Sequence, residues 1–418
     1  MQTISNAPST SERVAHVIFE HAVKISKEND ISALANLNAD LARDLTGAER
    51  CSLWLLEPHG EMWTRVAHVM PEIRIHQGFG IVGACVAENQ TIIINDAKSH
   101  PQFFSGVDDN SGYRTHSVAC VPLTVDQRVI GAIQALNKEG GFSAEDGELL
   151  RLMAVYSAAA IQAERLRHDA QTAMLLQREL EIAAEVQRKL LPEAGANWPG
   201  IEVAALCRPA KSVGGDFYDL LELPGERFGL TLGDVSGKGF PAAVMMASIH
   251  TLLRNLLLHN PANLARMFEE LNETIHRSSS AERYSTLFCG VLNPERSELT
   301  YVNAGHIPPF VVRSGGRIER AGETDVPVGL LPGSPYRQHS VQIAPGDLIV
   351  CVSDGIIEAQ NPEGELWDSS QAEDILRNCM HLPVPEILDQ LVCAVDEYAA
   401  GSEQADDITA VVLRSGGK

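Results

Sequence analysis

Apolar residues recur along the first third of the chain at two spacings, which predict two kinds of element. From about residue 14 to 46 they follow the spacing of an amphipathic helix, and residues 1–18 read as a disordered tail. Short apolar runs bounded by turn residues then predict strands at residues 51–56, 63–68, 91–94, 117–125 and 129–136. Helix, strands and a following helix indicate a small α+β module with an antiparallel sheet over residues 19–160.

A long helix is predicted next. Between Gly147 and Pro192 the chain contains neither Gly nor Pro, and Ser143 with Asp146 matches a helix-capping pattern. One heptad seam, which Gln187 interrupts, carries Leu166, Ala173, Leu176, Leu180, Ala183 and Leu190. The seam favours a parallel coiled-coil dimer through a linker at residues 161–192. A single amphipathic helix lying on its own domain is the alternative, because the Ala and Gln positions weaken the seam.

The second half of the chain combines many strand-like runs with two pairs of helices. Pro192 and the stretch 195–200, which contains Gly and Pro, end the long helix. Strands are predicted at residues 201–207, 217–223, 228–234, 286–292, 299–303, 310–313, 339–343, 347–353 and 408–413, and helices at 241–258, 261–276, 372–379 and 385–399. Two helices inserted between β-rich blocks predict a β-sandwich with helices on both faces over residues 193–418.

Composition narrows the class of function. The 418 residues carry a formal net charge of -22 and a pI of about 5.0, which argues against a nucleic-acid binder or a protein held on an anionic membrane. No apolar run reaches the roughly 20 residues of a membrane span, and the polar N-terminus does not resemble a signal peptide. None of the eight Cys residues forms a Cys-x-x-Cys pair, so we expect buried free thiols in a reducing cytoplasm.

Four loops that bear Asp follow or interrupt apolar runs in the second half. They read Gly-Gly-Asp at 214–216, Gly-Asp-Val-Ser-Gly-Lys-Gly at 233–239, Ser-Asp-Gly at 353–355 and Asp-Asp-Ile-Thr at 406–409. Gly beside Asp lets the backbone turn sharply and approach a ligand, and gathered carboxylates suit Mg²⁺ or Mn²⁺. Two such ions can activate water and neutralise phosphoryl oxygens, which predicts a metal-dependent phosphate hydrolase without a covalent enzyme intermediate.

Each carboxylate has an expected part in that site. Asp234 has two oxygens with which to bridge two ions, and the carbonyl of Val235 adds a further ligand. Asp354 and Asp406 complete the shell of the first ion. Asp216 acts on the second ion, directly or through water.

Residues from about 182 to 415 resemble the metal-dependent protein phosphatases of the PPM superfamily, in particular the bacterial SpoIIE/RsbU-type serine/threonine phosphatases. The resemblance rests on the four loops in order, on Glu-x-x-x-Glu-Val-Gln-Arg-Lys-Leu-Leu-Pro at 181–192 and on Asn-Ala-Gly-His-x-Pro-Pro at 303–309. It implies a β-sandwich flanked by helices and two Mg²⁺ or Mn²⁺ ions. The positions that match the family's metal-binding residues are Asp216, Asp234, Val235, Asp354 and Asp406.

The same resemblance implies a protein substrate that carries phosphoserine or phosphothreonine, often an anti-sigma-factor antagonist with a STAS domain. Asp407 falls where relatives carry Asp or Asn, which ranks it below Asp406 and leaves a third ion open. Asp219 and His306 are expected to be structural. Eukaryotic relatives grip phosphate with an upstream Arg, whereas the nearest cations here are Arg208 and Lys211.

Residues of about 20–165 resemble a GAF domain, a sensor of small ligands or other signals. Asn137, Lys138, Phe142 and Asp146 partly match the signature of cyclic-nucleotide-binding members, although Gly147 replaces the expected acidic residue. The resemblance implies an unidentified small ligand, with a cyclic nucleotide as one alternative, or a role in dimerisation and protein sensing. We expect a homodimer through the GAF domain and the linker helix.

The leading hypothesis is therefore a cytoplasmic, signal-regulated protein phosphatase. In it the long helix repositions the Gly-Lys-Gly loop and the helix that follows. A ligand-sensing scaffold with weak or no catalysis is one alternative, and the intact acidic motifs argue against it. A metal-dependent phosphoesterase for small substrates is the other, although the second half contains no nucleotide-binding fingerprint.

Overall fold

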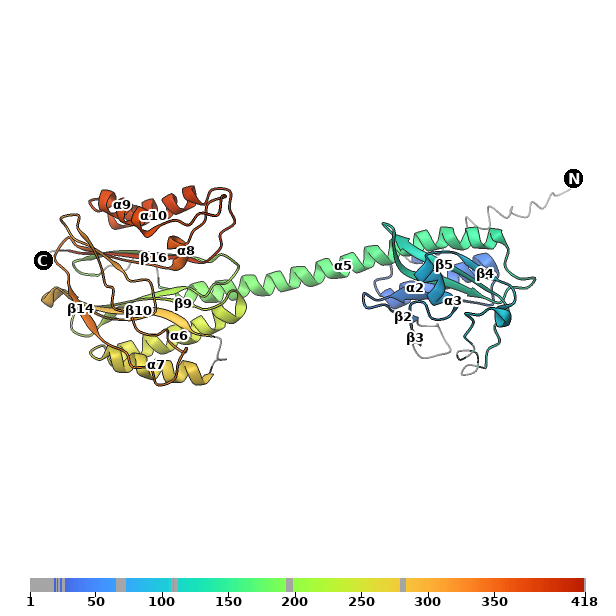
Figure 1. The fold of residues 1–418 in the computed structure, drawn as a ribbon, viewed down its shortest axis with the longest axis horizontal. Coiled ribbons are helices and arrows are strands. Elements are labelled where there is room, and N and C mark those ends of the chain that lie inside the picture. Colours follow the sequence, from blue (N-terminus) through green and yellow to red (C-terminus); the bar gives the residue numbers. More distant parts are fainter. Residues whose placement is uncertain are drawn as a thin grey trace, which may run out of the picture. The chain divides into compact units, whose positions relative to one another are not determined.

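The computed structural model describes residues 19, 21, 23, 24, 27–64, 73–104, 106, 108, 112–192, 198–278 and 283–416. The predicted tail at 1–18, and residues 65–68 of the strand predicted at 63–68, lie outside the described residues. The chain divides into two compact units, Met1–Leu175 and Leu176–Lys418 (Figure 1).

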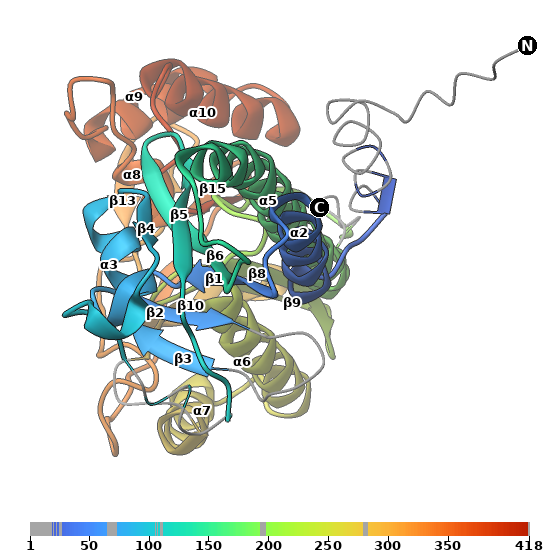
Figure 2. The same ribbon diagram turned by 90° about the vertical axis from the view of Figure 1, so that its right-hand side faces the viewer.

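The first unit is built on a six-stranded antiparallel sheet in the order β3-β2-β1-β6-β5-β4. Its strands are β1 (Arg50–Leu56), β2 (Glu61–Thr64), β3 (Ile73–His76), β4 (Ile92–Ile94), β5 (Val118–Val125) and β6 (Arg128–Leu136). One face of the sheet packs on α2 (Ile31–Thr46) and on the first turns of α5 (Ala144–Leu190). The other face packs on α3 (Gly80–Glu88), near the short 3-10 helix η1 (Ala97–Ser99) (Figures 1 and 2). This is the α+β module that the sequence predicts.

Side-chain caps set the start of both helices on that first face. Asp30 Oδ1 accepts a hydrogen bond from Ala33 N at 2.7 Å, so α2 begins at Ile31 and the helix predicted from residue 14 to 46 is not one element. At α5, Asp146 Oδ2 accepts from Ser143 N at 2.9 Å, and Ser143 Oγ accepts from Asp146 N at 3.2 Å. This reciprocal capping box confirms the capping pattern at 143–146, and such caps contribute about 1 kcal/mol.

The second unit consists of two five-stranded antiparallel sheets, ordered β14-β11-β10-β9-β8 and β13-β12-β15-β16-β7. The strands of the first sheet are β8 (Phe217–Leu223), β9 (Arg227–Val235), β10 (Ser285–Asn293), β11 (Glu298–Ala304) and β14 (His339–Gln342). Those of the second are β7 (Ile201–Arg208), β12 (Phe310–Val312), β13 (Ile318–Arg320), β15 (Leu348–Val352) and β16 (Ile408–Ser415). The helices are α6 (Phe240–His259), α7 (Leu264–Ser278), η2 (Pro294–Arg296), α8 (Asp354–Ile357), α9 (Ser369–Cys379) and α10 (Val384–Tyr398).

Apolar side chains fill three layers of this unit. Phe288, Leu232 and Val411 belong to the layer between the two sheets. The outer face of the first sheet packs on α6 and α7, and that of the second on α8, α9 and α10. Figures 1 and 2 both show α6 and α7 on the opposite side of the sheets from α9 and α10. The predicted β-sandwich with helices on both faces is confirmed.

One helix of this sandwich departs from an expectation drawn from the sequence. By length and composition α6 is apolar enough to cross a membrane, so the expectation that no run qualifies was wrong. Its residues Met246, Ile249 and Leu253 lie in the protein core against the first sheet, and a core helix of this kind passes the same test. The eight Cys residues are free, as expected, but four are buried and Cys393 is exposed.

Candidate metal and phosphate site

The first sheet contributes two of the four Asp loops to one end of the sandwich. Phe217 at the start of β8 pairs with Gly233 near the end of β9. This register sets Asp216 across from Asp234, because each lies one residue beyond that pair. Val235, the residue after Asp234, has a buried side chain.

The second sheet contributes the other two loops. Ser353 N donates to Thr409 O at 2.9 Å, and Thr409 N donates to Ser353 Oγ at 2.9 Å. These bonds hold the turn after β15, where Asp354 begins α8, beside the start of β16. Asp406 lies two residues before β16, so its carboxylate enters the same region as that of Asp354.

Asp407 fastens the loops of the two sheets together. Its Oδ2 accepts hydrogen bonds from Gly215 N at 2.7 Å and from Asp216 N at 3.3 Å. Its Oδ1 accepts from Ala210 N at 2.8 Å. Both carboxylate oxygens are therefore engaged by backbone N–H groups, which favours Asp406 over Asp407 as an ion ligand.

Three glycines of the motifs stand where no larger residue fits. A Cβ on Gly214 would lie 2.2 Å from Asp407 Oδ2, and one on Gly215 would lie 2.7 Å from the Val235 carbonyl oxygen. A Cβ on Gly355 would lie 2.0 Å from the carbonyl oxygen of Asp407. The sequence signal of Gly beside Asp thus reports close packing of these loops, against the Asp407 side chain at Gly214 and against backbone at Gly215 and Gly355.

The carboxylates raise one another's pKa values. Burial, and then the charges of Asp354 and Asp406, raise the pKa of Asp234 to about 7. Burial, and then the charge of Asp234, raise the pKa of Asp216 well above its usual range. Burial, and then the charge of Asp406, raise the pKa of Asp354. Three carboxyl groups whose charged forms are disfavoured in this way create an environment that nearby cations would stabilise.

The donor set fits hard divalent cations. Asp216 is 2% exposed, and its Oδ2 is buried without a hydrogen-bond partner, which leaves a buried polar oxygen to be compensated. Carboxylates with a backbone carbonyl are the ligands that Mg²⁺ and Mn²⁺ take. The side chains are neighbours and not a closed ligand cage. No group of three or more His, Cys, Asp or Glu side chains in the described part of the chain could hold an ion as it stands.

The cations near the site have distinct partners. Arg208 forms two hydrogen bonds with Asp396 of α10, one of them Nη1 to Oδ2 at 2.9 Å, and so ties β7 to α10. Lys238 lies 2.9 Å from Asp406 Oδ2, and this hydrogen bond raises the pKa of Lys238. From the sequence, Arg208 and Lys211 were the cations considered for phosphate binding, and Lys238 was missed. The available signal was its position between two glycines inside the predicted Asp loop at 233–239.

 Asp219 is buried, accepts a hydrogen bond from Arg254 Nη1 at 2.6 Å and lies 3.4 Å from His250 Nε2, so it links β8 to α6. His306 N donates to Asn303 Oδ1 at 2.8 Å, which fixes the turn after β11. Burial lowers the pKa of His306 to about 4, so this side chain is neutral near pH 7 and is not suited to act as a general acid.

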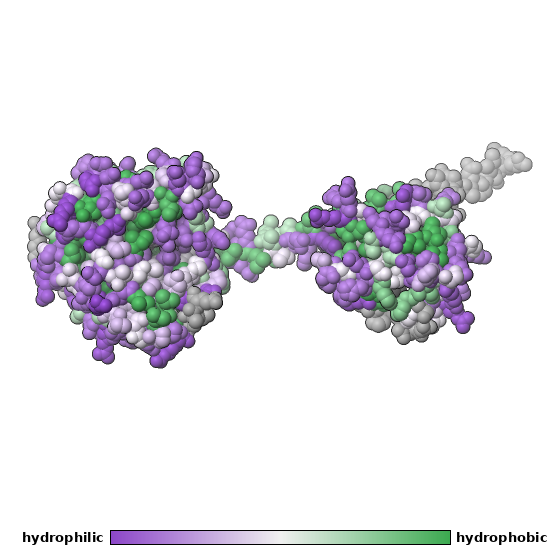
Figure 3. Space-filling view, viewed as in Figure 1, coloured by the Kyte–Doolittle hydropathy of each residue, from purple (hydrophilic) through white to green (hydrophobic). Residues whose placement is uncertain are grey.

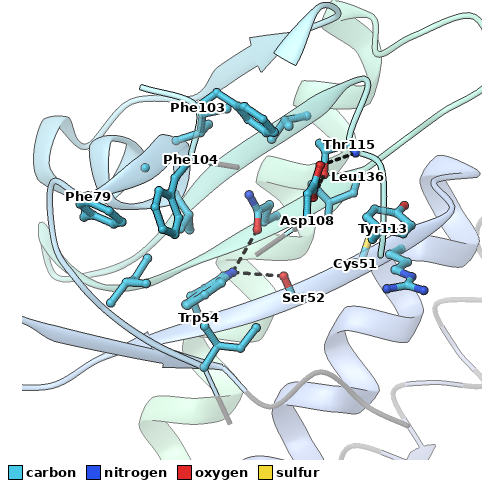
Figure 4. A pocket seen from close by; sticks show the side chains of 18 residues that line it. Cys51, Ser52, Trp54, Phe79, Phe103, Phe104, Asp108, Tyr113, Thr115 and Leu136 are labelled. Carbon is cyan, nitrogen blue, oxygen red and sulfur yellow. Dashed lines mark hydrogen bonds between the residues drawn. The ribbon is translucent and has the colours of Figure 1, made fainter. Parts of the chain in front are cut away.

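The first unit contains a cavity of about 120 Å³ (Figure 4). Its walls are mainly aromatic and aliphatic, and they include Trp54, Phe79, Phe103, Phe104 and Tyr113. Trp54 Nε1 donates to Ser52 Oγ at 3.1 Å and to Gln134 Oε1 at 3.2 Å, and Asp108 Oδ1 accepts from Thr115 Oγ1 at 2.8 Å. The polar groups drawn in the cavity are thus largely bonded to one another, and the remaining surface is apolar.

The signature residues of the first unit do not line this cavity. Asn137 Oδ1 accepts from His116 N at 2.7 Å, and its Nδ2 donates to Arg114 O at 2.8 Å. Lys138 Nζ lies 2.5 Å from Asp146 Oδ1, which ties the end of β6 to the start of α5. These residues hold loops together and give no support for a cyclic nucleotide.

Comparisons with known proteins bear on both units. A family model described as Stage II sporulation protein E (SpoIIE) matches residues 224–415, and a GAF domain model matches residues 30–161. The phosphoserine phosphatase RsbU of Bacillus subtilis is 28% identical over 273 residues, which cover 64% of this chain and 78% of RsbU.

Two further comparisons are more limited in what they show. The protein IcfG of Synechocystis sp. is 28% identical over 263 residues, which cover 56% of this chain but only 41% of IcfG. The solved SiaA-PP2C domain of Pseudomonas aeruginosa is similar with a TM-score of 0.54 at 23% identity, over 59% of this chain and 99% of that chain. The latter likeness shows the fold alone.

Proposed function

We propose that this protein hydrolyses phosphoserine or phosphothreonine on a protein substrate. It carries a SpoIIE-type phosphatase domain of the PPM superfamily, which follows a GAF domain in the sequence. The observation that carries the proposal is the meeting of Asp216, Asp234, Asp354 and Asp406 at one end of the two sheets. RsbU, which is named a phosphoserine phosphatase, supports the reaction class.

These side chains have distinct parts in the proposed reaction. Asp234 and the Val235 carbonyl would hold two Mg²⁺ or Mn²⁺ ions together with Asp354, Asp406 and Asp216. The ions, when bound, lower the pKa of a water and neutralise phosphoryl oxygens. The protein's own contribution is to fix the carboxylates through Asp407 and the close-packed glycines, so that the site is rigid before substrate arrives.

The proposed substrate is a phosphorylated STAS protein, and the proposed location is the cytoplasm. We retain the boundaries 19–160 for the sensor, 161–192 for the linker and 193–418 for the phosphatase. A phosphoprotein offers binding surface beyond its phosphoryl group, and that binding energy can be used to lower the barrier.

Rates on two substrates test this proposal. With Mn²⁺, we expect kcat/KM on a phosphoserine STAS protein to exceed that on para-nitrophenyl phosphate by about 100-fold, because only the protein substrate contacts surface outside the ion site. Faster turnover of para-nitrophenyl phosphate would indicate a phosphoesterase for small substrates. Binding of the STAS protein without turnover of either substrate, in the full chain and after removal of residues 1–160, would indicate a scaffold.

We also propose that α5 regulates the phosphatase through Gln187. Gln187 Nε2 donates to Gly214 O at 2.6 Å, and Gly214 N donates to Gln187 Oε1 at 3.2 Å. Gly214 lies two residues before Asp216, and Tyr218 Oη donates to Pro192 O at 3.0 Å just beyond the helix. A shift or rotation of α5 would therefore move the loop that carries Asp216.

Gln187→Ala tests this linkage. We expect the Mn²⁺ concentration for half-maximal activity to rise about 5-fold or more, because two hydrogen bonds that place the Asp216 loop are lost. Gln177→Ala removes an exposed glutamine from the same helix and should have no effect. An unchanged Mn²⁺ dependence in Gln187→Ala would rule out the proposed route.

A homodimer through the GAF domain and α5 is part of the same proposal. Leu166 and Leu176 of the heptad seam are both more than half exposed, and apolar side chains show on the surface of α5 (Figure 3). Leu152 and Val155 are also more than half exposed and continue the seven-residue spacing back into the first unit. A second copy of the helix would cover this seam. A monomer by light scattering at the concentration used for activity would contradict the dimer.

A small ligand in the GAF cavity is the proposed signal. A cavity of about 120 Å³ is close to the roughly 150 Å³ that accommodates a benzene ring, and its walls are aromatic. These features favour a small uncharged ring compound over a cyclic nucleotide. Ligand-observed NMR with indole and with cyclic AMP tests the preference, and binding of cyclic AMP alone would contradict it.

A further inference from the structure

Lys238 stands between the ion site and an adjacent cleft. It belongs to the loop between β9 and α6, four residues after Asp234. Its neighbours Gly237 and Gly239 have φ values of +93° and +76°, and a Cβ on either would meet no atom within 4 Å. The loop therefore needs glycine for its left-handed backbone and not for packing, and Lys238 alone projects a long side chain from it.

The ammonium group of Lys238 contacts one of the two carboxylate oxygens of Asp406. Its Nζ lies 2.9 Å from Asp406 Oδ2 and donates to Ala405 O at 2.6 Å. The other oxygen, Asp406 Oδ1, accepts from Asp407 N at 2.9 Å. An ion that binds Asp406 through Oδ2 would have to displace or share this contact with Lys238.

The contact is exposed enough to be exchanged. The side chain of Lys238 is 46% exposed and that of Asp406 is 39% exposed. Ion pairs of this exposure hold weakly, whereas a divalent ion among several carboxylates binds far more strongly. The flexible four-carbon stem of lysine allows the ammonium group to move without a change in the backbone.

The ammonium group of Lys238 could contact a second partner in the cleft beside it. It has a volume of about 610 Å³ and is bordered by Asp354, Asp406 and the chain from 399 to 405. Its lining includes two cations, Arg208 and Lys238, and Arg208 is held by Asp396. When a metal ion binds Asp406, Lys238 loses its partner. A phosphorylated segment that enters this acidic cleft would then meet Lys238 as an available cation.

We propose that Lys238 couples ion binding to phosphate binding, by neutralising Asp406 before the ions bind and by gripping a phosphoryl oxygen of the substrate afterwards. This inference rests on the proposed function and deepens it, because it assigns the residue that recognises the phosphoryl group. It makes Lys238 a competitor of the metal and a ligand of the substrate, so its loss has opposite effects on the two affinities.

Lys238→Met in the full chain tests both halves. We expect Mn²⁺ to bind about 2- to 5-fold more tightly by calorimetry, because an exposed competing cation is removed. We expect the KM for the phosphoserine STAS protein and the inhibition constant for inorganic phosphate to rise about 10-fold or more, because a charge-assisted hydrogen bond is lost. Lys238→Arg keeps the charge and should restore phosphate binding to within about 3-fold.

The matched control is Lys98→Met, which removes the same charge from an exposed lysine of the first unit that does not line the cleft and should change neither affinity. Weaker or unchanged Mn²⁺ binding in Lys238→Met would overturn the proposal, as would unchanged inhibition by phosphate. Failure of the wild type to hydrolyse any phosphoprotein would instead refute the proposed function. Titrations with Mn²⁺ and inorganic phosphate need no turnover and would still decide the role of Lys238.

Discussion

Asp234→Asn is expected to lower Mn²⁺-dependent phosphate release by about 1000-fold or more, the scale seen when a residue central to catalysis is removed. Asp234 lies near the end of β9 opposite Asp216, and its charge also acts on that carboxyl group, so one substitution weakens the hold on both ions. Steady-state phosphate release by the full chain provides the measurement. Asp389→Asn, on the exposed face of α10, is the matched control and should retain full activity.

The same variant should remain folded, and its stability without metal should show why the site needs cations. The pKa of Asp234 is raised to about 7, so the folded chain holds a proton there that the unfolded chain releases near pH 4. Its ionisation thus costs stability as pH rises from about 4 to 7, and Asn removes this cost. In EDTA, Asp234→Asn should melt at a higher temperature than the wild type at pH 8, with the difference shrinking toward pH 5. A lower melting temperature at pH 8 would contradict this account.

Gly355→Ala is expected to cost about 2–3 kcal/mol of stability and to abolish tight Mn²⁺ binding. Its Cβ would lie 2.0 Å from the carbonyl oxygen of Asp407, which belongs to the main chain and cannot rotate away. Relief of the clash must separate the turn at Asp354 from the start of β16, and so from Asp406. Thermal unfolding and Mn²⁺ calorimetry of the full chain measure the two effects.

The control for that substitution is Gly315→Ala, since a Cβ at Gly315 meets nothing within 4 Å and its backbone is not left-handed. It should leave both stability and Mn²⁺ affinity nearly unchanged. If Gly355→Ala behaved like this control, the close packing of the Asp354 turn on β16 would not be what holds the carboxylates together.

Local patterns in the sequence were sufficient for most of the fold. Strands β8 and β9 follow from apolar runs bounded by turn residues, and the absence of Gly and Pro predicted α5. The helix α3 escaped notice because Gly80–Glu88 is apolar almost throughout, contains two glycines and shows no amphipathic spacing. Packing on the sheet stabilises this helix, although the residue pattern of Gly80–Glu88 does not predict one.

The candidate site was predicted in its residue types but not in its contacts. Gly beside Asp identified the loops, whereas only the fold shows that Asp407 is engaged by the backbone of the Gly-Gly-Asp loop. Gln187 looked like a defect in the heptad seam, and its partner Gly214 lies 27 residues away. The contact of Lys238 with Asp406 spans an even longer stretch of chain, so no local pattern could reveal it.

The measurement that tests the central claim most directly is Mn²⁺-dependent phosphate release from a phosphoserine STAS protein by the full chain and by Asp354→Asn. Asp354 begins α8 just after β15, and its charge acts on Asp234, so the account predicts turnover that requires Mn²⁺ and is lost in the variant. Equal turnover by the wild type and Asp354→Asn, or turnover that persists in EDTA, would contradict it.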